Sequence, residues 1–212
     1  MKKLLILSAA LAPFAAQASD LVINGCVIEP ETKCENADLS GANLRNADLS
    51  GAILTGANLS GADLRHAKLK NTNFEKANLQ GTNFARADMR HATVRGAKLQ
   101  NANLEAINGW ALFAQGANFH KANLHGANLN FARFSGAKLQ YANLQAANLE
   151  IAWMTKVDLT GANLKNANLQ EAKLNAANLE NADFTGVRKH FATFQATYME
   201  GCKNCPFGWS KN

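Results

Sequence analysis

Apolar residues recur along the chain with a period of five, and two positions of each five carry the pattern. In the frame that starts at Ala37 and steps by five to Thr197, 26 of 33 positions are alanine. Two residues further on, the 33 positions from Leu39 to Met199 hold 20 leucines, six phenylalanines, three methionines and one valine. No insertion interrupts this frame, so we expect one five-residue unit to repeat along most of the chain.

A period of five fits neither an α-helix nor a flat strand. On a helix a step of five rotates by about 140°, so the leucines would spread around the whole circumference. On a flat strand successive steps of five alternate between faces, so half of the leucines would be exposed. Only a coiled path that turns a corner every five residues directs every alanine and leucine inward. The pattern therefore predicts an all-β solenoid, in which each coil depends on its neighbours.

The repeating unit, Ala-Asp/Asn-Leu-x-Gly/Asn, is plain at Ala42-Asn43-Leu44 and at Ala162-Asn163-Leu164. Through it, the chain resembles the pentapeptide repeat proteins across roughly residues 32–199. The resemblance implies a right-handed quadrilateral β-helix with four pentapeptides per coil. About eight such coils would form a rod roughly 40 Å long, at about 4.8 Å per layer. We expect an N-terminal cap at 19–36, repeats at 37–199 and a C-terminal cap at 200–212.

One stretch, residues 106–115, keeps the frame but inverts the order of sizes. Ile107 and Leu112 occupy alanine positions, while Gly109 and Ala114 occupy leucine positions. Because large and small residues have exchanged places, the interior volume is roughly kept, and we expect an irregular, distorted coil here. The distortion would be either a local packing variant or a device that pushes aromatic side chains outward.

A second break is Lys189, which occupies a leucine position. An unpaired lysine is costly in a closed apolar interior. We therefore expect residues 186–190 to bulge, with Phe194 and Met199 returning to the core.

The N-terminus has the features of a secretory signal peptide at residues 1–18. Lys2 and Lys3 precede an apolar run that is too short to span a bilayer, and Ala16-Gln17-Ala18 supplies small residues for cleavage. The alternative is a buried N-terminal helix, but no later segment is suited to receive one. We expect the mature protein to begin near Ser19 and to reside in the periplasm or outside the cell, with no membrane span after cleavage.

The charge of the chain is mildly basic. Removing Lys2 and Lys3 lowers the 22 lysines and arginines to 20 against 16 acids, so the formal charge falls from +6 to +4. A balance of this size favours solubility and loose attraction to anionic surfaces. It does not predict a nucleic-acid partner, which would need clustered charge on one face.

Four cysteines flank the repeats, and an even number in an exported protein suggests disulfides. If the chain forms the rod that the resemblance implies, Cys26 and Cys34 lie near one end, and Cys202 and Cys205 near the other. A disulfide needs Cα atoms within about 7 Å, so only the two local pairings are possible. The same separation excludes a four-cysteine zinc site within one molecule.

Apolar residues also fall on outward positions of the C-terminal half. A step of 20 residues compares successive coils, and it places Phe131, Ile151 and Phe191 on one corner. Large exposed apolar groups usually mark a contact surface. The alternative is that the tail after Gly186 folds back and covers them. The predicted patch consists of Trp110, Phe113, Phe131, Ile151 and Trp153.

No catalytic constellation is evident in the sequence. The five histidines fall on outward or irregular positions without a nucleophile or carboxylate pair beside them: His66, His91, His120, His125 and His190. There is no phosphate-binding loop, and we expect no cofactor and no metal. The Cys202-x-x-Cys205 motif permits a thiol redox function, but that interpretation requires a thioredoxin-like strand and helix around it.

These observations favour an exported, non-enzymatic scaffold or binding protein that presents its surface to a protein or cell-envelope partner. The family resemblance implies a second possibility, since some pentapeptide repeat proteins imitate duplex DNA and modulate DNA gyrase. A DNA mimic would be studded with acids, whereas this chain is basic and carries an export signal. Family members also pair end to end, so a homodimer is a further expectation.

Overall fold

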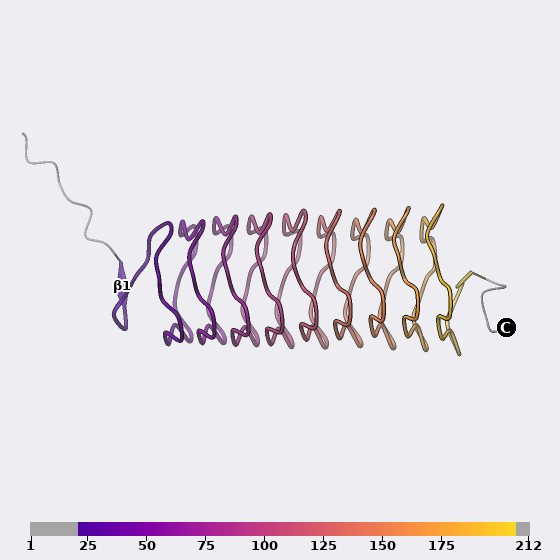
Figure 1. Cartoon of the computed structure of the whole chain (residues 1–212), viewed down its shortest axis with the longest axis horizontal. Helices are drawn as coiled ribbons and strands as arrows, with labels where there is room; N and C mark the ends of the chain where they lie inside the picture. Colours follow the sequence, from indigo (N-terminus) through magenta and orange to yellow (C-terminus); the bar gives the residue numbers. More distant parts are fainter. Residues whose placement is uncertain (1–20, 207–212) are drawn as a thin grey trace, which may run out of the picture.

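Backbone hydrogen bonds between successive coils hold the fold together. In the computed structural model, which describes residues 21–206, the central residue of each repeat forms a parallel bridge to the residue 20 positions later. The bridges run from Lys33 with Ile53 to Asp183 with Lys203. Four repeats therefore complete one coil, and the coils stack into the rod of Figure 1. The chain forms a right-handed quadrilateral β-helix, which confirms the expected fold.

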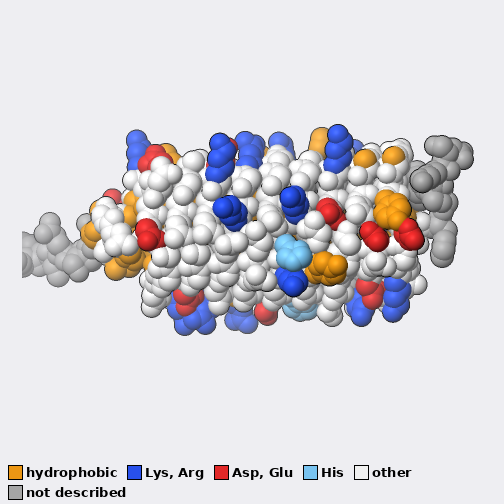
Figure 2. Space-filling view, turned by 90° about the horizontal axis from the view of Figure 1, so that it is seen from below, with side chains coloured by type: hydrophobic (Ala, Val, Ile, Leu, Met, Phe, Trp, Pro, Cys, Tyr) orange, Lys and Arg blue, Asp and Glu red, His pale blue; other side chains and the backbone are white. Residues whose placement is uncertain are grey.

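The rod has four sides, each centred on a column of stacked residues 20 positions apart. Side 1 is the column that begins at Lys33, side 2 at Asp38, side 3 at Asn43 and side 4 at Asp48. A corner joins each side to the next, and the corner after side 4 leads to side 1 of the following coil. In the view of Figure 2, basic side chains are scattered along the rod, and hydrophobic ones reach the surface only in separate places.

Each corner is a tight turn with one residue in the left-handed region. At a representative corner, the Ala42 N–H donates to the Leu39 carbonyl at 3.2 Å, and Gly41 between them has a φ of 64°. This hydrogen bond, with a positive φ at the third residue, is the geometry of a type II turn. Glycine and asparagine tolerate that position best, which explains why they recur in the fifth place of the repeat.

The alanine and leucine positions of the repeat face the interior. Every leucine position from Leu39 to Phe184 is buried, as is every alanine position from Ala52 to Ala182. Each leucine buried in this way contributes about 1.5–3 kcal/mol. Three alanine positions hold threonines whose hydroxyls donate to carbonyls of the preceding coil, Thr72 to Leu49 at 2.8 Å, Thr82 to Leu59 at 2.7 Å and Thr197 to Leu174 at 2.9 Å. The interior is therefore apolar, with its few hydroxyl groups satisfied.

A short hairpin precedes the coils at the N-terminal end (Figure 1). Strands β1 (Val22–Ile23) and β2 (Cys26–Val27) pair antiparallel. The coil ladder then begins earlier than the predicted boundary at residue 37, because the Glu31 N–H already donates to the Ser50 carbonyl. It also continues past residue 199 to Lys203. The predicted caps at 19–36 and 200–212 are thus partly built from repeats.

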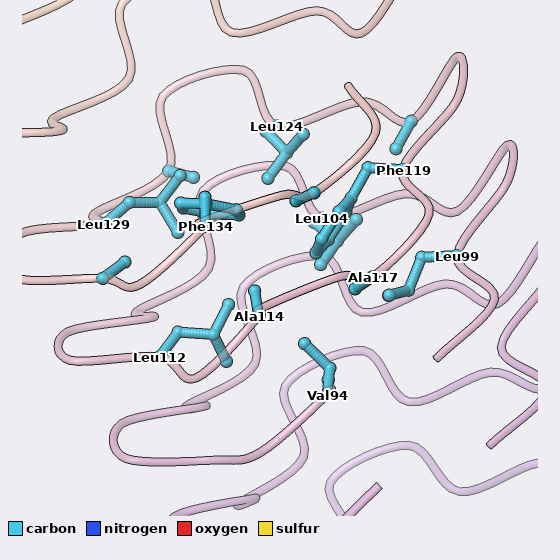
Figure 3. Close-up of a cluster of buried hydrophobic side chains, with 14 of the residues drawn as sticks. Val94, Leu99, Leu104, Leu112, Ala114, Ala117, Phe119, Leu124, Leu129 and Phe134 are labelled. Carbon is cyan, nitrogen blue, oxygen red and sulfur yellow. The ribbon is translucent and has the colours of Figure 1, made fainter. Parts of the chain in front are cut away.

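The predicted distortion at residues 106–115 is wrong, since the coil stays regular through the inverted repeats. The Gly109 N–H donates to the Asn128 carbonyl at 2.8 Å, and Ile107 is buried in its alanine position. A Cβ on Gly109 would lie 2.9 Å from a Leu129 methyl, so the neighbouring side chains already occupy the missing volume. Figure 3 shows Leu112 and Phe134 in the interior close to Ala114. Large and small residues compensate without moving the backbone.

The predicted bulge at residues 186–190 is also wrong. Arg188 forms the regular bridge with Asn168, and the Ala192 N–H donates to the Lys189 carbonyl at 3.1 Å. Lys189 remains partly exposed because no described coil follows it on its side of the rod. Its ammonium group is therefore not confined in a closed lumen, and the backbone has no reason to leave the frame. The expected return of Phe194 to the core is confirmed.

Candidate interaction surface

Side 3 carries a continuous ladder of asparagine amides. The Nδ2 group of each donates to the Oδ1 atom one coil earlier, at 3.2 Å for Asn103 to Asn83 and 3.1 Å for Asn123 to Asn103. The ladder continues through Asn143 at 3.0 Å and Asn163 at 3.3 Å. Because these amides bind one another, the column of side 3 from Asn83 to Asn163 is neutral and offers few unsatisfied groups to a partner.

An aromatic cluster lies on the corner between sides 4 and 1. The ring of Trp110 packs edge-to-face against His91 at 4.8 Å and against Phe131 at 5.6 Å between ring centroids. Trp110 remains 37% exposed and Phe131 42% exposed. The structure thus brings together two of the predicted patch residues and adds His91 from the preceding coil, a contact that the sequence frame alone did not reveal. Edge-to-face packing keeps these rings ordered while their outer surfaces stay open to solvent.

The other predicted aromatic residues lie next to this cluster, on side 1. Phe113 is half-buried beneath two guanidinium groups, those of Arg95 and Arg133, each 5.1 Å from the ring centroid. Trp153 is 50% exposed, with the Lys173 ammonium 5.8 Å from its ring. Side 1 therefore combines aromatic rings with cations that contact them.

The apolar corner residues have an unfavourable backbone. Phe131 has a φ of 60° and Ile151 a φ of 57°, in the left-handed region. A positive φ is rare for a bulky residue and a genuine outlier for a β-branched one. At the same corner in two successive coils of the N-terminal half, glycine and asparagine appear instead, at Gly51 and Asn71. The coil ladder holds these residues in place, as it does other non-glycine residues with positive φ at corners along the rod, such as Lys76 and Arg86.

Some exposed aromatic residues were not part of the predicted patch. Tyr141, 58% exposed, packs edge-to-face against His120 at 5.7 Å on the corner between sides 2 and 3. Tyr198, 42% exposed, donates to the Glu200 carboxylate, which raises the pKa of the phenol. Both tyrosines lie outside the inward alanine and leucine positions of the repeat, so the sequence frame could have identified them as exposed.

The part of the tail that the structure describes does not fold back over the patch. Residues 186–206 follow the coil frame, with Thr193 and Tyr198 forming regular bridges to the preceding coil. Phe191, on the corner of the aromatic cluster, is 73% exposed. The remaining residues, 207–212, lie outside the described part of the chain.

Both predicted disulfides are present. Cys26 bonds to Cys34 across a Cα separation of 5.6 Å, and Cys202 bonds to Cys205 across 5.8 Å. The first joins strand β2 to the first repeat, and the second closes the end of the last described coil. Both therefore fasten the ends of the ladder, where edges are otherwise open.

In the described region, two aspartates accept hydrogen bonds from arginines at the corners that follow them. The Asp63 carboxylate accepts a hydrogen bond from Arg65 Nε at 2.8 Å, and Asp88 accepts one from Arg90 Nε at 2.8 Å. These side-chain hydrogen bonds lower the pKa of each carboxyl. Within residues 21–206 no group of three metal-binding side chains is found.

The predicted signal peptide at residues 1–18 lies outside the described residues. Between residues 21 and 206, no helix is long and apolar enough to cross a membrane.

The fold and this surface define a β-solenoid repeat protein whose side chains fill its own interior. The family model for pentapeptide repeats matches 8 copies, at residues 32–71, 67–105, 115–150 and 152–188. This is more than half of the 212 residues, and the chain belongs to the pentapeptide repeat family. The interval without a match between 105 and 115 coincides with the exchange of sizes at Ile107 and Gly109.

Several solved structures are similar to the chain. HetL, a pentapeptide repeat protein involved in heterocyst differentiation regulation in Nostoc sp. strain PCC 7120, is 26% identical over 82% of this chain and 89% of its own, with a TM-score of 0.40. Rfr23 from Cyanothece 51142 is 35% identical over 43% of this chain and 63% of its own, with a TM-score of 0.42. QnrB1, a plasmid-mediated fluoroquinolone resistance protein, is 18% identical over 82% of this chain and 90% of its own, with a TM-score of 0.33. None of the curated proteins compared with the chain matches it significantly.

Proposed function

We propose that the protein is an exported, non-enzymatic scaffold that binds a protein or another cell-envelope component through its aromatic patch. The patch comprises Trp110, Phe113, Phe131, Ile151 and Trp153. The N-terminal sequence supports export to the periplasm or the cell exterior. The inward leucine and alanine positions are filled by buried side chains between residues 52 and 184, which supports a binding role for the outer surface.

One observation carries the proposal, namely that corner positions with a positive φ hold apolar side chains that are exposed at Phe131 and partly exposed at Ile151. Phe131 and Ile151 occupy a position where glycine or asparagine would cost less. Phe131 also leaves 42% of its surface in water. Such a residue improves neither the stability of the fold nor the solubility of the protein. Contact with a partner would explain its presence.

The test is capture of partners by the tagged protein from solubilised cell envelope. The variant W110S/W153S removes the two exposed indoles of the patch. Y198S is the matched control, because it removes an exposed aromatic ring from side 2. The proposal expects an envelope partner that the wild type and Y198S retain and W110S/W153S loses, and it expects fractionation to place the protein outside the cytoplasm. Partners unchanged by W110S/W153S would remove the patch from this role.

The two alternatives have direct assays. A gyrase modulator would change DNA supercoiling by purified gyrase, although side 3 from Asn83 to Asn163 offers neutral amides where a DNA mimic needs acids. A thiol redox protein would reduce insulin catalytically through Cys202 and Cys205, a pair that here closes the end of a solenoid. Activity in either assay would displace the scaffold proposal.

A further inference from the structure

Six exposed basic side chains gather on sides 1 and 2 and on the corner between them. Between residues 93 and 178, this surface carries a single acid, Asp158. Six cations and one carboxylate give it a formal charge of +5, compared with +4 for the chain without Lys2 and Lys3. We call these cations the basic strip: Arg95, Lys98, Arg133, Lys138, Lys156 and Lys173.

The charges of the basic strip are not neutralised within the described part of the chain. The ion pairs of residues 21–206 form elsewhere, for example between Arg65 and Asp63 and between Arg90 and Asp88. The one nearby carboxylate, Asp158, accepts hydrogen bonds at 2.7 Å from both Gln140 and Thr160. The strip therefore carries an excess of unpaired positive charge that attracts an external anion.

Aromatic rings alternate with the cations along side 1. Moving one coil at a time, the column reads Phe113, Arg133, Trp153, Lys173. Arg133 contacts the Phe113 ring and Lys173 the Trp153 ring, at 5.1 and 5.8 Å. These contacts hold the long basic side chains against the rod. Like groups consequently recur every two coils, about 10 Å apart at roughly 4.8 Å per coil.

We propose that the basic strip binds a linear acidic polysaccharide. Its carboxylate or phosphate groups would pair with Arg133 and Lys173, and the apolar faces of its sugar rings would pack on Phe113 and Trp153. A two-coil spacing is comparable to the length of a disaccharide, so a polyuronate with one carboxylate on each sugar can present every second carboxylate to a cation of the strip. The inference rests on the proposed function, since export brings the protein to such polymers.

The shape of the strip favours a flexible polymer over a lipid bilayer. Sides 1 and 2 belong to a quadrilateral coil and face different directions, so a flat membrane would meet either Arg133 and Lys173 or Lys98 and Lys138. A flexible chain crosses the corner at Arg95 and Lys156 and reaches both sets. An acidic polysaccharide therefore uses more of the strip than a membrane surface does.

The test is binding of the purified protein to alginate, a polymer of uronic acids, followed by tryptophan fluorescence or calorimetry. Neutral dextran and vesicles of phosphatidylglycerol are the comparison probes. R133Q/K173Q removes two strip cations. R45Q/R86Q is the matched control, because it makes the same change of charge on the corner between sides 3 and 4, diagonally across the rod. All four positions are exposed, so the variants are expected to fold.

We expect R133Q/K173Q to bind alginate about five- to tenfold more weakly, and R45Q/R86Q to stay within about twofold of the wild type. Affinity should fall steeply with added salt, and dextran should not bind. An equal loss in both variants would overturn the inference, because it would show attraction to net charge alone. Absence of alginate binding at low salt, or tighter binding to the vesicles, would overturn it as well.

The outcomes separate this inference from the proposed function. If alginate is not bound but W110S/W153S still loses an envelope partner, the inference fails and the scaffold function stands. If the protein is found in the cytoplasm, the scaffold function fails, whereas R133Q/K173Q still reports whether the strip recognises the polymer.

Discussion

At the scale of single residues, the corners of the rod show where folding and surface properties conflict. The repeat favours glycine or asparagine at the residue with positive φ, as at Gly51 and Asn71. Ile151 adopts the same conformation with a β-branched side chain, at a cost of about 1–2 kcal/mol. The neighbouring coils supply the hydrogen bonds that hold it there, since the Ile151 N–H donates to the Gln170 carbonyl at 2.9 Å.

We predict that I151N stabilises the fold and weakens partner binding. Asparagine relieves backbone strain, so the free energy of unfolding should rise by about 1 kcal/mol. Chemical denaturation measures the first effect and envelope capture the second. The matched control is E171N, one coil further along the same corner with a φ of 58°, which should stabilise without loss of the partner. A destabilised I151N would contradict the strain argument.

The exchange of sizes at residues 107 and 109 leads to a second prediction. I107A should cost about 2–5 kcal/mol because it leaves a cavity beside Gly109. G109L should cost about 1–3 kcal/mol because the Leu129 side chain already fills its space. The double variant I107A/G109L restores the usual order and should be more stable than either single variant. Thermal or urea unfolding of the four proteins measures the coupling, and additive losses would refute compensation.

At the scale of structural elements, the frame of alanines and leucines predicted most of the architecture. It specified which residues of a repeat face inward and that the path turns every five residues, whereas four repeats per coil and the local disulfides followed from the family resemblance. It did not predict the regular coil at 106–115, because the space beside Gly109 is filled by Leu129 from the next coil. The spacing of residues in the sequence shows where a residue lies in the repeat, but it does not show which side chains of neighbouring coils pack against it.

The same limit applies to the candidate surface. A step of 20 residues placed Phe131 and Ile151 on one corner, as the structure has them. It did not show that Trp110 packs between Phe131 and His91 of adjacent coils, because such contacts depend on side-chain rotamers. Binding by the patch stays a prediction.

The N-terminal hairpin offers a prediction about one element. Strands β1 and β2 contribute few residues, and a two-stranded hairpin is marginal without further support. Replacing Cys26 and Cys34 with serine should therefore loosen the first repeat while leaving the central coils folded. Hydrogen exchange should rise in residues 21–36 by at least tenfold and stay unchanged near Leu124. Uniformly faster exchange along the rod would contradict this local role.

At the scale of the whole molecule, charged corners make stability depend on acid. Hydrogen bonds from Arg65 and Arg90 lower the pKa of Asp63 and Asp88 from the ordinary value of 3.8. A lowered folded-state pKa means that the stabilisation is complete above about pH 4 and is lost as the pH falls through the folded-state values. Both carboxylates are near the surface, so each contribution is modest.

We accordingly predict that the free energy of unfolding is nearly constant from about pH 5 to 7 and falls below about pH 4. D63N/D88N should flatten that fall. Asparagine fits these positions, because the same columns hold Asn83 and Asn108. Urea denaturation across this pH range provides the measurement. If the free energy of unfolding of D63N/D88N fell with pH as steeply as that of the wild type, other carboxylates would control the acid sensitivity.

The central claim is that the molecule works through one part of its outer surface, the aromatic patch, while the asparagine ladder on the opposite side stays free. The most direct measurement is photocrosslinking in living cells, with a photoreactive phenylalanine analogue placed either at Phe131 or at Asn103. We predict crosslinks to an envelope component from position 131 and none from position 103. Crosslinks of equal yield from both positions, or from position 103 alone, would contradict the account.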